Sequence, residues 1–125
     1  MAKFIPALQH AVQHSPYDLI RYTEYQNKLD IELLDVRQQA LQLQFNNPLL
    51  IRKMRESDAV DTLGQIQSSG GLARWIYKVE GSELVDWMTQ QGFDKRRTED
   101  LLHYCILTQS AVLEVVTVEA PRVLG

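Results

Sequence analysis

The stretch GSELVDWM, at positions 81–88, constrains the fold of this chain more than any other segment. Gly81 can turn the chain sharply, and the hydroxyl of Ser82 can accept hydrogen bonds from the amides of the following turn, as helix-capping serines do. The apolar residues that follow recur at helical spacing: Leu84, Val85, Trp87 and Met88. We therefore predict a short helix that ends before Gly92 and packs through this face. Trp87 is expected in the core, and a place in a functional groove is the alternative.

Size and composition indicate one ordinary globular domain with an appendage. A chain of 125 residues is long enough to bury about two thirds of its extended surface. Its 45% hydrophobic and 23% charged residues exclude the intrinsically disordered class. The net charge of −3 gives no overall attraction for nucleic acid or anionic membranes. Binding of that kind needs a local patch of charge.

Cysteine usage and hydropathy favour an intracellular, cytoplasmic protein. Cys105 is the single cysteine, so it cannot form an internal disulfide, and its apolar neighbours predict a buried core thiol. No apolar run approaches the ~18 residues of a membrane span, and residues 1–6 are too interrupted for a secretory leader.

A long helix is predicted between Pro16 and Phe45, because this region contains no glycine and no further proline. Its apolar residues follow heptad steps of four and three: Leu29, Leu33, Val36, Ala40 and Leu43. About 30 residues of helix would extend about 45 Å, longer than the rest of such a domain is wide. We expect the helix to form a coiled coil that oligomerises the protein. Packing on its own domain is the alternative.

The rest of the chain divides into shorter predicted elements. The patterns predict helices over residues 3–14, 49–56 and 95–109, a hairpin formed by residues 61–67 and 72–79, and a strand over 112–118. Boundaries at Pro48 and after residue 118 give three regions: an N-terminal helical segment (1–47), a compact domain (48–118) and a tail (119–125). The fold class expected is mainly α with a small β-hairpin (α+β).

The order of elements from residue 49 to 117 resembles the DEP domain. Residues 81–88 are similar to that family's Gly-Ser-Glu-Leu-Val-Asp-Trp signature, and Met54 lies where the family has its first helix. The resemblance implies a winged-helix-like core of three helices with a protruding hairpin, and it implies protein partners or a membrane surface. Departures are Glu80, where the family has an apolar residue, and a hairpin without the family's basic and aromatic run.

No pattern in the sequence predicts catalysis, a metal site or a cofactor. His10 and His14 are four residues apart, but no glutamate or cysteine accompanies them at ligand spacing. Serine, histidine and carboxylate residues occur without the context of a nucleophile motif. We expect a protein that is not an enzyme.

The residues expected to make contacts flank the GSELVDWM stretch. The cations Lys95, Arg96 and Arg97 form one cluster, for which a solvated turn, a protein or lipid contact and DNA are the alternatives. Ser69 and Gly70 would form the hairpin tip. We expect an adaptor, or a subunit of a larger assembly, with protein partners. The alternatives are a dimeric winged-helix DNA-binding regulator and a structural subunit of a phage or secretion particle; nucleic acid and membrane surfaces are less expected partners.

Overall fold

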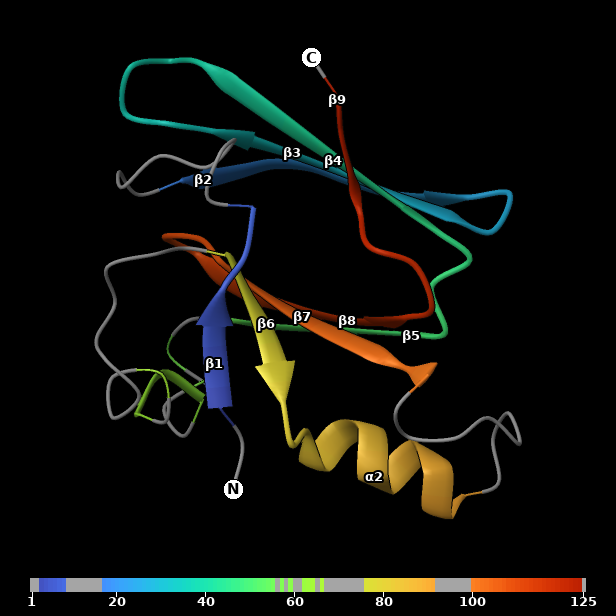
Figure 1. Cartoon of the computed structure of the whole chain (residues 1–125). Coiled ribbons are helices and arrows are strands. Elements are labelled where there is room, and N and C mark those ends of the chain that lie inside the picture. Colours follow the sequence, from blue (N-terminus) through green and yellow to red (C-terminus); the bar gives the residue numbers. More distant parts are fainter. Residues whose placement is uncertain are drawn as a thin grey trace.

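Two antiparallel β-sheets lie face to face in the computed structural model, which describes residues 3–8, 17–55, 57, 59, 62–64, 66, 76–91 and 100–124 (Figure 1). The five-stranded sheet has the order β1 (Lys3–Pro6), β6 (Ile76–Glu80), β7 (Leu102–Leu107), β8 (Ala111–Thr117), β5 (Leu50–Arg55). The four-stranded sheet has the order β2 (Asp18–Tyr25), β3 (Lys28–Leu34), β4 (Ala40–Asn46), β9 (Arg122–Leu124). Helix α2 (Glu83–Gln90) lies on the side of the five-stranded sheet that faces away from the other sheet.

Strands β3 and β4 show why the predicted long helix is wrong. In both strands buried residues alternate with partly exposed ones, which is the period of a strand that has one face on a core. The buried members are Leu29, Ile31, Leu33, Leu41, Leu43 and Phe45. The mainly α fold class and the coiled coil are corrected accordingly: residues 18–46 form three strands of a β-sandwich.

The turns between these strands use neither glycine nor proline. Gln26 and Asn27 join β2 to β3 with φ angles of 47° and 60°, the left-handed backbone of tight hairpin turns. Between β3 and β4 the carboxylate of Asp35 accepts hydrogen bonds from the amides of Arg37 and Gln39, at 2.8 and 2.9 Å. These hydrogen bonds to the Asp35 side chain stabilise the turn, although the segment lacks the glycine or proline from which a turn is usually predicted.

The five residues of the predicted heptad seam separate in the structure, and Leu43 is buried in β4. Leu29 and Leu33 are fully buried in β3, between the two sheets. Val36 lies in the turn after β3 with 58% of its surface exposed, and Ala40 is exposed at the start of β4. The seam residues therefore do not share one face, because some lie on the inner face of a strand and others in a turn or at a strand end.

Other predicted helices are also strands where the structure describes them. Residues 50–55 form β5 and residues 102–107 form β7, and both pair with β8. Residues 3–6 form β1 against β6, and β9 in the predicted tail pairs with β4. The winged-helix-like core is therefore wrong. The short helix is confirmed as α2 and the strand near residues 112–118 as β8; the strand expected over 72–79 is described only as β6.

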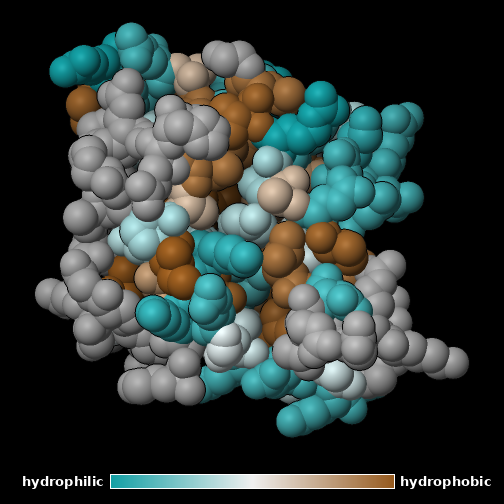
Figure 2. All heavy atoms as spheres, in the orientation of Figure 1, coloured by the Kyte–Doolittle hydropathy of each residue, from teal (hydrophilic) through white to brown (hydrophobic). Residues whose placement is uncertain are grey.

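Hydrophobic side chains pack on both faces of the five-stranded sheet. One face meets the four-stranded sheet, where the largest cluster includes Phe45 and Tyr104 with ring centroids 5.8 Å apart. The opposite face packs against α2, whose Val85 and Met88 contact Val116 of β8. Strand β8 is consequently buried along its whole length. In the orientation of Figure 1, hydrophobic atoms gather toward the middle of the visible face, with hydrophilic atoms at its top and right (Figure 2).

No helix in the described part of the chain has both the length and the apolar character that crossing a membrane requires.

Candidate functional site

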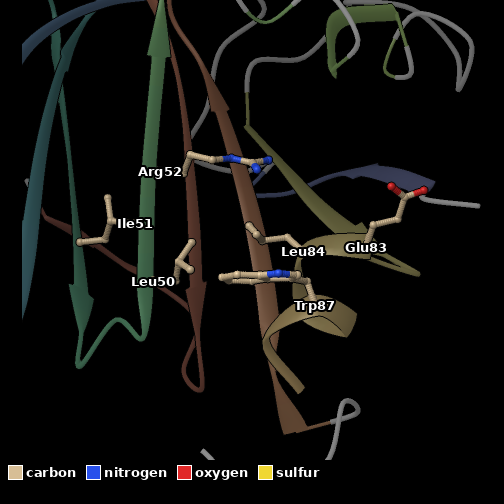
Figure 3. A pocket seen from close by; sticks show the side chains of 6 residues that line it. All are labelled: Leu50, Ile51, Arg52, Glu83, Leu84 and Trp87. Atoms are coloured by element: carbon tan, nitrogen blue, oxygen red, sulfur yellow. The ribbon is translucent and has the colours of Figure 1, made fainter. Parts of the chain in front are cut away.

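A groove of about 520 Å³ lies between the edge strand β5 and helix α2. It is lined by Leu50, Ile51, Arg52, Glu83, Leu84 and Trp87. Figure 3 shows the indole of Trp87 extending from α2 toward Leu50, with Leu84 beside it and Glu83 pointing away from Leu50. We call this surface the Trp87 groove.

Trp87 has 51% of its surface exposed, although the sequence favours a place in the core. Helix α2 turns by about 100° per residue, and its face toward the sheet is occupied by Val85 and Met88. Trp87 falls on the flank of that face, where its ring covers apolar side chains and remains open to solvent. The structure thus places it in the groove that the sequence offered only as the alternative.

The start of α2 has the local structure that its sequence predicts. Gly81 has a φ of 63°, a conformation that other residues rarely adopt, and it turns the chain from β6 into the helix. The hydroxyl of Ser82 accepts a hydrogen bond from the amide of Val85 at 3.1 Å. The helix axis, and with it Trp87, is fixed relative to the sheet by these two residues.

Four polar residues form a network under the start of α2, beside the Trp87 groove. Ser82 Oγ lies 2.6 Å from His103 Nδ1, and His103 Nε2 lies 3.0 Å from Glu114 Oε1. The other carboxylate oxygen, Glu114 Oε2, accepts a hydrogen bond from Arg52 Nε at 2.7 Å and also contacts Arg52 Nη2. Ser82, His103 and Glu114 are 6%, 5% and 3% exposed. We call these four residues the buried polar network.

Sheet register brings the network together. Arg52 on β5 pairs directly with Glu114 on β8, and His103 lies on β7, the other neighbour of β8. Ser82, at the N-cap of α2, contacts His103 from the helix side. The network lines a second pocket of about 80 Å³, which shares Arg52, Glu83 and Leu84 with the Trp87 groove. Two adjoining hollows of different character, one apolar and one polar, therefore lie between the sheet and α2.

The ionisation of Glu114 is set by its partners. Burial alone would raise its pKa, but the hydrogen bonds from His103 and Arg52, together with their charges, outweigh burial and hold the pKa below its usual value. An ionised carboxylate can only accept, so His103 Nε2 carries the proton of that hydrogen bond. In the neutral ring Nδ1 is then free to accept a hydrogen bond from the Ser82 hydroxyl.

Cys105 pairs with Glu114 in the sheet and is the buried thiol that the sequence predicts. Its surroundings keep it protonated: burial raises the pKa of the thiol, and the negative charge of Glu114 raises it further. A protonated buried thiol is a poor nucleophile and a poor metal ligand. Cys105 therefore has a packing role.

We predict that acid weakens the fold through Glu114. Because the folded pKa lies below the ordinary value of 4.5, the ionised carboxylate stabilises the fold above that pH, and the contribution is lost as the pH falls through the folded value. Urea unfolding of the wild type and Glu114→Gln should show a clear difference in unfolding free energy at about pH 7 and a smaller one at about pH 2. An equal difference at both pH values would contradict this assignment.

The residues predicted to make contacts are only partly placed. Ser69, Gly70, Lys95, Arg96 and Arg97 lie outside the described residues, as do His10 and His14. Within the described part, no three histidine, cysteine, aspartate or glutamate side chains gather as a possible metal site.

Sequence reasoning missed the buried polar network, because it identified Ser82 only as a helix cap and found no context for a nucleophile motif. The available signal is weak: His103 and Glu114 are polar residues inside two apolar strands. Only strand register, which the sequence does not display, shows that they meet.

Comparisons with protein-family models, with curated proteins and with solved structures gave no match, so they do not test the resemblance to the DEP domain.

Proposed function

We propose that the protein is an interaction module, acting as an adaptor or as a subunit of a larger assembly, that holds a segment of a partner protein in the Trp87 groove. The observation that carries this proposal is the half-exposed Trp87 in a groove of about 520 Å³. Tryptophan is among the residues that contribute most to binding when a partner covers them. Keeping so large an apolar ring at the surface has no evident benefit for folding.

The groove favours a partner segment with an apolar anchor and a neighbouring basic residue. Leu50, Leu84 and the face of the Trp87 ring offer an apolar contact. The exposed charges on α2 are acidic, Glu83 and Asp86, and its last turn has no basic residue. Arg52 is paired with Glu114, so its charge is already balanced. A lysine or arginine beside the anchor would gain from the carboxylates and from the indole ring.

The DNA-binding alternative loses its structural basis in the described residues. It needs a recognition helix from Lys95 and a long dimerisation helix. Residues 102–107 form a strand, and residues 18–46 form three strands. A structural subunit of a particle is one form of the assembly role proposed above, and it requires the same kind of protein contact.

We predict that Trp87→Ala weakens partner capture and leaves the fold intact. Immobilised wild type, Trp87→Ala and Ile20→Ala would each be used to capture proteins from the native cell extract. Ile20 is the matched control, because it is also a large apolar residue, 52% exposed, on the four-stranded sheet. The wild type and Ile20→Ala should enrich the same protein. With that protein purified, Trp87→Ala should weaken its affinity by about 30-fold, the effect of a ~2 kcal/mol contact.

Equal affinity of the three variants for the captured protein would contradict the proposal. Circular dichroism and thermal unfolding of Trp87→Ala provide the folding control. The exposed ring should affect both only slightly.

A further inference from the structure

We propose that Ser82, His103 and Glu114 form a hydrolytic site that cleaves esters of short carboxylic acids. This inference goes beyond the interaction role, and its chemistry rests on the buried polar network. The Trp87 groove would then have a second use, as the site for the apolar alcohol portion of the ester.

The geometry is that of a serine nucleophile with its base and an orienting acid. The hydroxyl of Ser82 is 2.6 Å from one ring nitrogen of His103, and the other ring nitrogen is 3.0 Å from the Glu114 carboxylate. The serine faces Nδ1 and the acid faces Nε2, the reverse of the arrangement in chymotrypsin-like enzymes. The chemistry requires only that one nitrogen can take the serine proton while the acid holds the other as N–H. Here Nδ1 faces the Ser82 hydroxyl, and Nε2 faces the Glu114 carboxylate.

The position of Ser82 at the helix cap supplies the groups that an oxyanion needs. The first amides of a helix have no acceptor within the helix, so the N–H groups of Glu83 and Leu84, the two residues after Ser82, have no partner within α2. The amide of Val85 donates to Ser82 Oγ at 3.1 Å and fixes the direction of the oxygen. Preorganised backbone donors of this kind stabilise the negative charge of a tetrahedral intermediate.

The two adjoining hollows define the substrate class. The pocket at Ser82 has a volume of about 80 Å³, enough for several water molecules or a short acyl group but not for a long chain. It shares Arg52, Glu83 and Leu84 with the larger apolar groove. An acetyl-sized acyl group fits the pocket, and an apolar or aromatic alcohol fits against Trp87.

The reaction proceeds by transfer of the acyl group to Ser82. Ser82 Oγ attacks the ester carbonyl carbon, and its proton moves to His103 Nδ1. The tetrahedral intermediate collapses with cleavage of the bond to the alcohol oxygen, and the alcohol takes the proton from Nδ1. Water then attacks the acyl-serine, again giving a proton to Nδ1, and the carboxylic acid leaves as Ser82 regains the proton. Ester and water become acid and alcohol, with no other reactant.

Glu114 and Arg52 are positioning residues in this scheme. Glu114 holds the ring and stabilises its protonated form, which exists only while the serine proton is on Nδ1. Arg52 keeps Glu114 in place through two contacts to one oxygen. Neither residue contacts the acyl group.

The test measures hydrolysis of p-nitrophenyl acetate and covalent labelling by a fluorophosphonate. The wild type should hydrolyse the ester, and mass spectrometry should locate the label on Ser82. Ser82→Ala should lose label and lower the rate on the order of 100-fold or more. Ser82→Asn should lose both as well, and it retains a side chain that can cap α2. Ser110→Ala, at an exposed serine, should change neither.

Glu114→Gln provides a readout that a purely structural role would not move. It should lower the rate and shift the acidic limb of the pH–rate profile to lower pH, because the protonated ring loses its anionic partner. The proposal is overturned if the wild type is not labelled at Ser82, or if its hydrolysis rate equals that of Ser82→Asn. Such a failure leaves the interaction role standing, because that role is read from partner affinity and from Trp87.

Discussion

Replacing Leu33 by alanine is expected to lower the free energy of unfolding by about 3 to 5 kcal/mol, whereas Val36→Ala should change it by less than about 0.5 kcal/mol. Leu33 is fully buried between the two sheets, and alanine would leave a cavity among close-packed side chains. Val36 is 58% exposed in the turn that follows. Denaturant unfolding of purified variants measures both values.

This pair of residues separates the sandwich from the helix that the sequence suggests. In a heptad seam, Leu33 and Val36 would occupy equivalent positions and their truncation would have comparable costs. In the β-sandwich, Leu33→Ala should lower the free energy of unfolding several-fold more than Val36→Ala. Similar losses for the two variants, together with a dependence of stability on protein concentration, would contradict the fold described here.

Arg52→Ala is expected to lower the free energy of unfolding by about 3 kcal/mol, near the lower end for loss of one partner from a buried ion pair. Glu114 is 3% exposed, and among its contacts within the described part of the chain it would keep the hydrogen bond to His103. The lower end applies because the Arg52 side chain is itself 45% exposed, so part of its interaction is weakened by solvent.

Arg55→Ala is the matched control for this variant. Arg55 is an exposed arginine on the same strand, and its loss should change stability by less than about 0.5 kcal/mol. If Arg52→Ala and Arg55→Ala have the same small effect in urea unfolding, the buried polar network does not stabilise α2 on the sheet. The Ser82 hydroxyl would then lack the fixed surroundings described above.

Local signals in the sequence predicted two elements correctly, α2 and β8. The start of α2 could be predicted because Gly81 and Ser82 determine the backbone within one turn. Strand β8 could be predicted because its residues are β-branched over most of its length. Both elements are specified by residues that are neighbours in the chain.

The long helix was wrongly predicted for the region of β2–β4 because the spacing of its apolar residues fits both a helix and a strand. Leu29 and Leu33 are four residues apart, which satisfies a helix face and also the even spacing of one strand face. The turns that decide between these alternatives use Gln26, Asn27 and Asp35, which are weaker turn signals than glycine or proline. The absence of strong helix breakers was therefore mistaken for helix continuity.

The candidate site could be predicted only in part for a related reason. Trp87 was identified, but its exposure depends on which residues of α2 face the sheet. The contacts among Arg52, His103 and Glu114 depend on the pairing of β5, β7 and β8. Which strands pair is decided by the whole fold, and it cannot be read from any single segment of the sequence.

Photo-crosslinking from position 87 tests the interaction role most directly. Trp87 and, in a separate variant, Ile20 would be replaced by a benzophenone amino acid, and each protein would be irradiated with the captured partner. Both positions are large, exposed and apolar, but they lie on different elements, α2 and β2. The account predicts a crosslink from position 87, with no crosslink from position 20. A crosslink from position 20 alone, or equal yields from both positions, would contradict it.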